Sequence, residues 1–254
     1  TPIGEKTLAH KLSNSIEITA IVKHQLAIKE LAQKIAFRQL FYAKAKLAKL
    51  DQEGYNKLIN WSKAEVKIPS LILKITTFLM PALFFTMLLL AYFSNNILYA
   101  YLTNTAFLLN LCVFALNLKA IKNEMVAAEK IHETIMQYAQ IFELIDKEEM
   151  HAEYLIEKKK ELVFEGEPAH LMFKKLSYYF SNLSSMQNPV GAVFFNGALL
   201  YHLGVYQNLL QWKNKHALFF EKYLSILGEF EALNSLANFS YNNDEFAFPA
   251  INNQ

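Results

Sequence analysis

The residues with the clearest chemical potential in this sequence are two Glu-x-x-His pairs, Glu129-x-x-His132 and Glu148-x-x-His151. In carboxylate-bridged bundle proteins, such pairs from two facing helices bind two metal ions. Here both pairs fall in what the hydrophobic spacing predicts to be one helix. They lie 19 residues apart, which at a rise of 1.5 Å per residue separates them by about 28 Å. One metal site cannot hold both, so a charged, solvated helix face is the better interpretation unless the helix breaks between them.

The usual signatures of nucleotide binding and nucleophilic catalysis are missing from the sequence. Its seven glycines fit neither a phosphate-binding loop nor a dinucleotide-binding fingerprint. No G-x-S-x-G segment marks a nucleophile, and the seven histidines are scattered over predicted helix faces. The single cysteine, Cys112, excludes an internal disulfide and a cysteine-based zinc site. We therefore expect no catalytic residue, metal or cofactor in this chain.

Three lysines lie close together at Lys44, Lys46 and Lys49. Residues 1–67, which contain them, carry 12 Lys or Arg against 6 Asp or Glu. Such a cluster could contact phosphate groups of nucleic acid or anionic lipid head groups. A run of lysines is more often only a solvated helix face, and both interpretations stay open.

The elements that would position these residues are predicted to be helices. Hydrophobic residues make up 53% of the chain and its mean hydropathy is positive, while scarce Gly and Pro argue against a turn-rich β fold. No alternating pattern demands a sheet, so we expect an all-α fold. Hydrophobic spacing, caps and breakers predict helices at 4–14, after a Ser15 cap, from before Tyr42, from an Asp51 cap to Trp61, at 190–212 and at 216–241.

Two uncharged apolar stretches dominate the middle of the chain, 75–93 with 19 residues and 97–118 with 22. Each is close to the roughly 20 residues that a helix needs to cross a bilayer. Ser94, Asn95 and Asn96 would form the turn between them. We interpret the pair as a transmembrane hairpin, because few helices of soluble proteins stay uncharged over such a length. The alternative is a hairpin buried at the centre of a soluble bundle.

Basic residues flank this hairpin at one end. In an antiparallel pair, Lys63, Lys67 and Lys74 would meet Lys119 and Lys122. Because positively charged flanks favour the cytoplasmic side, we expect both soluble flanks in the cytoplasm, at the cytoplasmic face of the inner membrane.

After Lys119, apolar residues with alternating spacings of three and four on a charged background predict a long amphipathic, coiled-coil-like helix. It could continue the second apolar helix directly, and it is expected to end near Phe164, where Gly166 and Pro168 supply a stop. These elements divide the chain into an N-terminal part of a helical core (1–67), the apolar hairpin (68–118), a lever-like helix (119–165) and the C-terminal part of the core (166–254).

Residues near both ends of the sequence resemble the core, or lever, domain of the MutS family of DNA mismatch repair proteins. At one end, Thr1, Gly4 and Leu8 form a T-x-x-G-x-x-x-L pattern before a helix that ends in KHQLAIKELAQKIAFRQ, with His24 where Arg is common. At the other end, GEFEALNSLA is the most specific stretch. The residues there that carry the resemblance are Trp212, Gly228, Glu229, Phe230, Glu231, Leu233, Ala237 and Pro249.

The resemblance implies a helical scaffold that couples DNA contacts to a dimeric ATPase domain. ATP and Mg would then be bound by a P-loop domain beyond Gln254, and this chain would itself be no enzyme. The Phe-x-Glu wedge of mismatch readers precedes this region in the family, whereas Phe219-x-Glu221 lies in a late predicted helix. The apolar pair stands where relatives extend a clamp toward DNA, so the resemblance implies a membrane-tethered variant.

Two main hypotheses follow. In the first, the chain is the core of a MutS-like DNA-binding ATPase related to mismatch repair, which is a homodimer in its full-length form. In the second, it is a membrane-anchored helical scaffold that binds protein partners and has no role on DNA. A ferritin-like metal enzyme is a third possibility.

Overall fold

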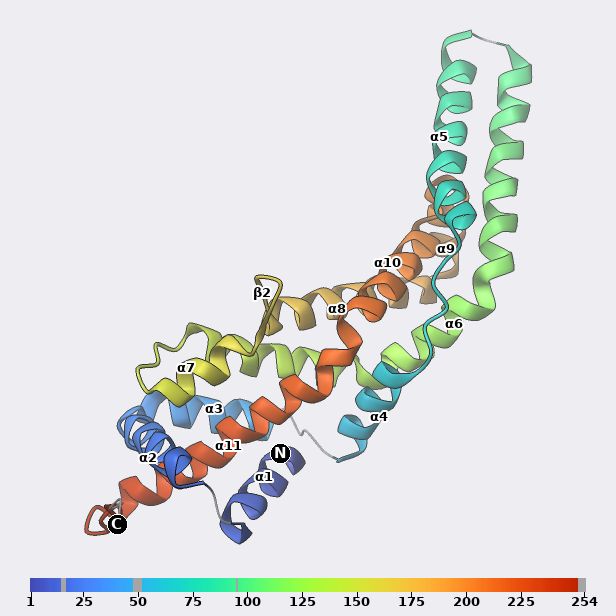
Figure 1. Cartoon of the computed structure of the whole chain (residues 1–254). Coiled ribbons are helices and arrows are strands. Elements are labelled where there is room, and N and C mark those ends of the chain that lie inside the picture. Colours follow the sequence, from blue (N-terminus) through green and yellow to red (C-terminus); the bar gives the residue numbers. More distant parts are fainter. Residues whose placement is uncertain (15–16, 48–51, 95, 251–254) are drawn as a thin grey trace. The chain divides into compact units, whose positions relative to one another are not determined.

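The computed structural model describes residues 1–14, 17–47, 52–94 and 96–250. Helices make up 85% of the chain and strands 2%, which confirms the predicted all-α class (Figure 1). Lys49, Ser15, Asp51 and Asn95, to which the sequence assigned a phosphate contact, two helix caps and a turn, lie outside the described residues.

The first part of the chain contains five helices within the described residues. They are α1 (Pro2–Ser13), α2 (Ile18–Gln33), α3 (Ile35–Leu47), α4 (Gln52–Lys63) and α5 (Leu71–Ser94). The remaining elements are α6 (Ile97–Lys147), α7 (Glu153–Lys160), β1 (Val163–Phe164), β2 (Glu167–Pro168), α8 (Ala169–Ser184), η1 (Ser185–Gln187), α9 (Pro189–Leu199), α10 (Tyr201–His216), η2 (Ala217–Phe219) and α11 (Phe220–Asn242).

The predicted lever-like helix is real but shorter than expected. The α6 helix does continue the second apolar stretch without a break, over 51 residues. It ends at Lys147, so the expectation of one helix up to Phe164 is wrong. A short helix, α7, and a two-stranded antiparallel hairpin follow instead, with Glu165 and Gly166 at positive φ in its turn.

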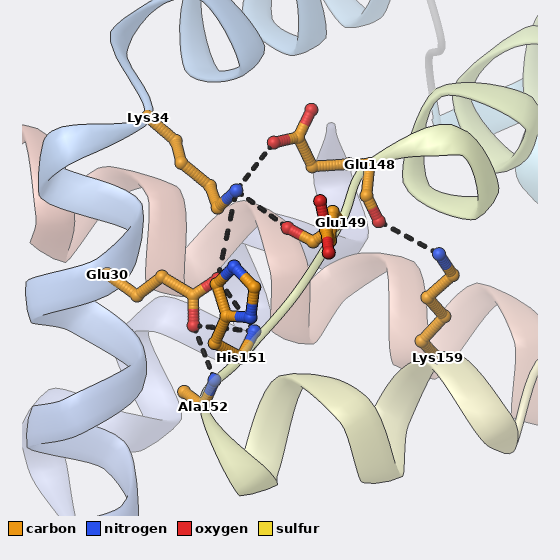
Figure 2. Close-up of polar contacts among 7 residues, drawn as sticks. All are labelled: Glu30, Lys34, Glu148, Glu149, His151, Ala152 and Lys159. Carbon is orange, nitrogen blue, oxygen red and sulfur yellow. Dashed lines mark hydrogen bonds and ion pairs between the residues drawn. The ribbon is translucent and has the colours of Figure 1, made fainter.

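The break after α6 is held by side chains from other helices (Figure 2). The ammonium of Lys34, the residue that follows α2, donates to the Glu149 carbonyl at 2.6 Å, and Lys159 on α7 donates to the Glu148 carbonyl at 2.8 Å. Lys34 also pairs with the Glu148 carboxylate at 2.7 Å. Two cations thus satisfy carbonyls just beyond the C-terminus of α6, where unpaired acceptors accumulate.

A carboxylate from another helix binds the backbone just before α7. Its N-cap residue is Ala152, whose side chain cannot accept a hydrogen bond. The Glu30 carboxylate on α2 accepts from the backbone N–H groups of His151, at 3.0 Å, and of Ala152 (Figure 2). Glu30, more than a hundred positions away in the sequence, thus fixes the two residues that lead into α7.

The predicted helix over 190–212 is also interrupted. Leu200 adopts a left-handed conformation with φ 49° between α9 and α10. The start of α9 follows the expected pattern, since Asn188 caps it by accepting from the Gly191 N–H and Pro189 occupies its first turn.

The chain forms two compact units that differ from the predicted division. Unit 1 comprises Thr1–Asn60, Glu133–Lys174 and Leu218–Gln254, and unit 2 comprises Trp61–His132 and Lys175–Ala217. Because α4, α6 and α8 each contribute residues to both units, boundaries placed at 67, 118 and 165 do not separate them. The C-terminal part of the predicted core is likewise shared between the units.

The core of unit 1 is rich in aromatic side chains. Tyr138, Phe142, Phe173 and Phe220 are each at most 1% exposed. The rings of Phe142 and Phe173 lie 5.0 Å apart, and those of Phe173 and Phe220 lie 4.9 Å apart, both in tilted arrangements. Such contacts bury large apolar area with a favourable ring geometry. The core therefore joins α6, α8 and α11.

Candidate membrane-inserted hairpin

Unit 2 contains the two apolar helices that the sequence predicted. Leu71–Ser94 and Ile97–Glu129 are both long and apolar enough to cross a membrane. In α5 only Pro81 and Phe84 are buried among the described residues, and 22% of the apolar window of α6 is buried inside the structure. The alternative of a hairpin enclosed by a soluble bundle predicts mostly buried helices. Within the described residues, the hairpin is instead largely uncovered by protein (Figure 1).

The surface of the hairpin consists of large apolar side chains. Their exposed fractions range from 39% for Leu90 and Leu102 to 86% for Leu116. In the two helices the exposed residues of this kind are Leu71, Ile72, Ile75, Phe78, Leu79, Leu83, Phe85, Leu88, Leu89, Leu90, Tyr92, Phe93, Ile97, Leu98, Tyr101, Leu102, Leu108, Leu109, Leu116 and Val126. An apolar patch of this extent marks a contact surface for lipid or protein.

Most hydroxyl groups in the hairpin are satisfied by its own backbone. Each donates to the carbonyl four residues earlier, as Ser and Thr hydroxyls in helices commonly do. This applies to Thr76, Thr77, Thr86, Ser94, Thr103 and Thr105. Among the other polar side chains of the hairpin, that of Asn104 is exposed on α6.

The short helix α9 packs against the side of the hairpin. Phe84 on α5, Ala106 on α6 and Ala198 on α9 form a buried apolar cluster with Phe107. At Gly197 a Cβ atom would overlap the Phe107 ring, so only glycine allows this approach.

A buried hydrogen bond secures the same contact. The Asn110 amide nitrogen on α6 donates to the carbonyl of Gly197 at 2.7 Å, and Asn110 is fully buried. The polar residue that the sequence placed inside an apolar span therefore faces another helix.

The base of α5 contacts α10. The Gln207 amide donates to the Thr77 hydroxyl at 2.7 Å and to the Leu73 carbonyl at 3.3 Å. Four residues further along α5, Pro81 lacks the N–H that would pair with the Thr77 carbonyl. The two helices of the hairpin are thus held by α9 and α10 within unit 2.

A polar network lies at the break between α9 and α10. The side-chain nitrogen of Asn196 donates to the Ala192 carbonyl at 2.6 Å and faces His202 Nδ1 at 2.7 Å. The side-chain oxygen of Asn196, Oδ1, accepts from the backbone N–H of His202. Since Nδ1 accepts, the imidazole proton sits on Nε2 and points at Ser185 Oγ, 3.0 Å away. His202 therefore cannot take a proton from Ser185, and the network is structural rather than a nucleophile with its base.

Unit 2 also buries a lysine. Lys213 on α10 is 2% exposed, and its ammonium lies 4.5 Å from the centroid of the Trp61 ring. Trp61 Nε1 donates to the Glu124 carboxylate at 2.9 Å. Burial lowers the pKa of Lys213, and the charge of Glu124 opposes that shift. The three side chains connect α4, α6 and α10 by a cation–π contact and a hydrogen bond.

The two terminal segments that resemble the MutS family pack against each other in unit 1. Gly228 on α11 lies so close to α1 that a Cβ atom there would come within 2.7 Å of Ile3 Cγ2 and Thr7 Oγ1. At Gly4 a Cβ would overlap the Glu231 side chain, which also accepts a hydrogen bond from the Thr1 hydroxyl. The T-x-x-G pattern and the GEFE stretch thus form one helix–helix contact.

Glu229 belongs to a second polar contact between these helices. It pairs with Lys11 on α1 at 2.7 Å and accepts from the Tyr154 hydroxyl at 2.9 Å. Burial, followed by the charge of Glu229, raises the pKa of Tyr154 well above its usual range. The Lys11 ammonium also lies 3.5 Å from His24 Nε2, and burial together with this charge lowers the pKa of His24.

The remaining residues of the resemblance are mostly structural. Phe230, Leu233 and Ala237 are buried in unit 1 and Trp212 is buried in unit 2. Pro249 is exposed, and its carbonyl accepts from Gln25 at 3.1 Å.

Two of the three predicted phosphate contacts, Lys44 and Lys46, lie on α3 within the described residues. Lys44 donates to Gln140 at 3.4 Å, and the Lys46 ammonium lies 5.6 Å from the Tyr42 ring. Lys46 lines an open groove of about 870 Å³ between α1, α3 and α11, together with Arg38.

The same groove is lined by a polar side chain whose hydrogen-bonding groups have no partner among the described residues. Asn234 is 9% exposed, and neither its amide nitrogen nor its carbonyl oxygen has a partner among the described residues. It lines the groove from α11.

The two Glu-x-x-His motifs do not lie in one helix. Glu129 and His132 lie within α6, whereas Glu148 and His151 follow its end and contact Lys34 and Glu30. In the parts of the chain that the structure describes, no group of three or more His, Cys, Asp or Glu side chains is arranged to hold a metal ion.

Sequence reasoning missed the role of α9. The signal was available, because no Asp, Glu, Lys or Arg occurs between Lys175 and Lys213. This uncharged segment is interrupted by Asn188, Pro189 and Asn196, and it therefore does not read as a span of bilayer length.

No protein-family model matches the chain, and neither does any curated protein or solved structure. The relationship to the MutS family therefore stays a prediction from the two terminal segments.

Proposed function

We propose that this chain is a membrane-anchored helical core whose apolar hairpin, α5 and the first part of α6, inserts into a bilayer. The exposure of nearly the whole hairpin carries the proposal, because leaving so many large apolar side chains in water is costly. Burying apolar surface is worth about 25 cal/mol per Å².

The charges at the base of the hairpin support one orientation. Lys67 and Lys74 precede or begin α5, while Lys119 and Lys122 follow the apolar part of α6. With this base on the cytoplasmic side, both soluble flanks lie in the cytoplasm, in accordance with the positive-inside rule.

Flotation of the full chain with lipid vesicles after an alkaline carbonate wash tests this proposal. An inserted hairpin resists carbonate and needs detergent for release. Recovery of a monodisperse, detergent-independent protein would refute the bilayer anchor and favour a protein partner on the hairpin surface.

We further propose that the soluble part acts as the lever core of a MutS-like DNA-binding ATPase. The favouring observation is that α1 and α11, the two segments of the resemblance, pack through Gly4, Gly228 and Glu231. In this proposal a following P-loop domain binds ATP and Mg, the full-length protein forms a homodimer, and the core transmits nucleotide state to DNA or membrane contacts.

Two measurements separate this from a scaffold that binds only proteins. The parent gene should encode GxxxxGK[ST] in the domain after residue 254, and its absence would rule out the ATPase proposal. The full-length protein should bind DNA at low salt, where phosphate contacts are strongest. Absence of binding under that condition would favour the scaffold.

A further inference from the structure

We infer that α9 is a third lipid-contacting element, inserted beside the hairpin in the leaflet at its base. The inference rests on the proposed insertion of the hairpin and names a further surface that the same bilayer would cover. One side of α9 is buried by the hairpin, through Gly197 and Ala198. The other side carries large apolar residues that nothing in the described structure covers.

The uncovered side of α9 is apolar throughout. Val190 is 79% exposed, Val193 51%, Phe194 62%, Phe195 47% and Leu199 43%. Phe194 and Phe195 stack edge to face, with their ring centroids 5.7 Å apart. Because α9 packs on helices whose own outer surface is apolar, these side chains continue the hairpin surface.

The depth of the contacts places α9 within the hydrocarbon. Asn110, which binds the Gly197 carbonyl, lies 13 residues after the start of α6 at Ile97, or about 20 Å along the helix. Phe84 lies 10 residues before the end of α5 at Ser94, or about 15 Å. A hydrocarbon core of about 30 Å that begins at the hairpin turn therefore still surrounds these positions.

The break after α9 is suited to such an environment. Non-helical backbone at membrane depth must have its polar groups satisfied by the protein. Here the Leu200 N–H donates to the Asn196 carbonyl at 3.1 Å, and the Gly204 N–H donates to the Leu200 carbonyl at 3.0 Å. Asn196 additionally binds both the backbone and the ring of His202. The hydrogen bonds named here are thus made within the protein at the break between α9 and α10, as a position inside the lipid requires.

Site-specific fluorescence in vesicles tests the inference on the full chain. In a Cys112→Ala background, Val193→Cys is labelled with the fluorophore NBD and reconstituted into phosphatidylcholine–phosphatidylglycerol vesicles. Leu108→Cys, near the middle of the apolar part of α6, serves as the reference inside the bilayer, and Asp244→Cys as the reference in water. Phe194→Cys repeats the measurement at a second exposed position of α9, should labelling at Val193 perturb folding.

We expect the label on α9 to lose fluorescence to doxyl groups placed along the lipid acyl chains and to resist quenching by aqueous iodide. If the Leu108 label is quenched by lipid while both α9 labels respond only to iodide, α9 lies in water and the inference fails, although the anchor stands. If the Leu108 label also responds only to iodide, the hairpin is not inserted, and the anchor and this inference both fail.

Discussion

At the scale of single residues, close helix contact in unit 1 depends on glycine. Gly228 allows α1 to approach α11, where Ile3 and Thr7 occupy the space that a side chain would need. In contrast, a Cβ atom at Gly204 on α10 would meet only the Thr77 methyl group, at an ordinary van der Waals distance of 3.8 Å. The close contact between helices therefore requires glycine at Gly228 but not at Gly204.

Gly228→Ala should destabilise unit 1 by about 1–3 kcal/mol, because the added methyl forces α1 away from α11. Gly204→Ala is the matched control and should be neutral or stabilising by up to about 1 kcal/mol, since Ala favours a helix and meets open space. Urea unfolding followed by circular dichroism measures both. Equal effects of the two substitutions would contradict the close contact.

The His24 environment predicts a pH dependence. Lys11, Lys158 and Glu229 are the charged groups near it, and burial together with Lys11 lowers its pKa below the ordinary value of 6.5. The unfolded state therefore binds the proton more readily, so the stability that neutral His24 contributes is present above about pH 6.5 and is lost as the pH falls below it.

His24→Gln should reduce the loss of stability between about pH 7.5 and about pH 5.5. The change in urea midpoint between the two pH values, compared with that of the unsubstituted chain, measures this. An unchanged pH dependence would show that His24 is not linked to folding.

At the scale of elements, the end of α6 and the start of α7 depend on α2. Glu30→Ala removes the acceptor of the N–H groups of His151 and Ala152, the two residues before α7, and should cost about 1–3 kcal/mol, a usual value for lost hydrogen bonds to a charged group. Glu65→Ala, at an exposed position between α4 and α5, should change stability by less than about 0.5 kcal/mol. Urea unfolding again distinguishes them, and indistinguishable midpoints would argue against a stabilising role of the Glu30 hydrogen bonds.

The hairpin predicts a different response to charge. Leu108→Arg places a cation on the exposed face of α6 near the middle of the proposed span, at a cost of about 2.5–3.5 kcal/mol for insertion. We expect less protein in the carbonate-resistant vesicle fraction. Leu218→Arg introduces the same charge at an 86% exposed residue of unit 1 and should leave flotation unchanged. Equal flotation of both variants would contradict lipid contact at Leu108.

At the scale of the whole molecule, two compact units with separate cores share three helices. Phe173→Ala removes a ring at the centre of the unit 1 core and should cost about 3–5 kcal/mol there. Because the hairpin belongs to unit 2, flotation with vesicles should persist after this substitution. Loss of both stability and flotation would show that the units do not act independently.

The sequence by itself determined the all-α class and the two apolar helices, and it allowed the second apolar stretch to continue into the amphipathic helix after Lys119, as it does in α6. These features depend on composition and on hydrophobic spacing along one segment, so local information is sufficient. The same holds for the Asn188 and Pro189 start of α9, since caps act within one turn.

Tertiary structure decided where α6 ends, which face of α9 is covered and which residues meet at α1 and α11. The α6 helix ends just before the Glu148 and Glu149 carbonyls that Lys159 and Lys34 bind, and α7 begins just after the N–H groups that bind Glu30 of α2. These partners are distant in sequence, and their effect depends on positions that no local pattern encodes. For the same reason the burial of Gly197 and Ala198 of α9 against the hairpin, on which the proposed lipid contact of its other residues rests, depends on the tertiary structure.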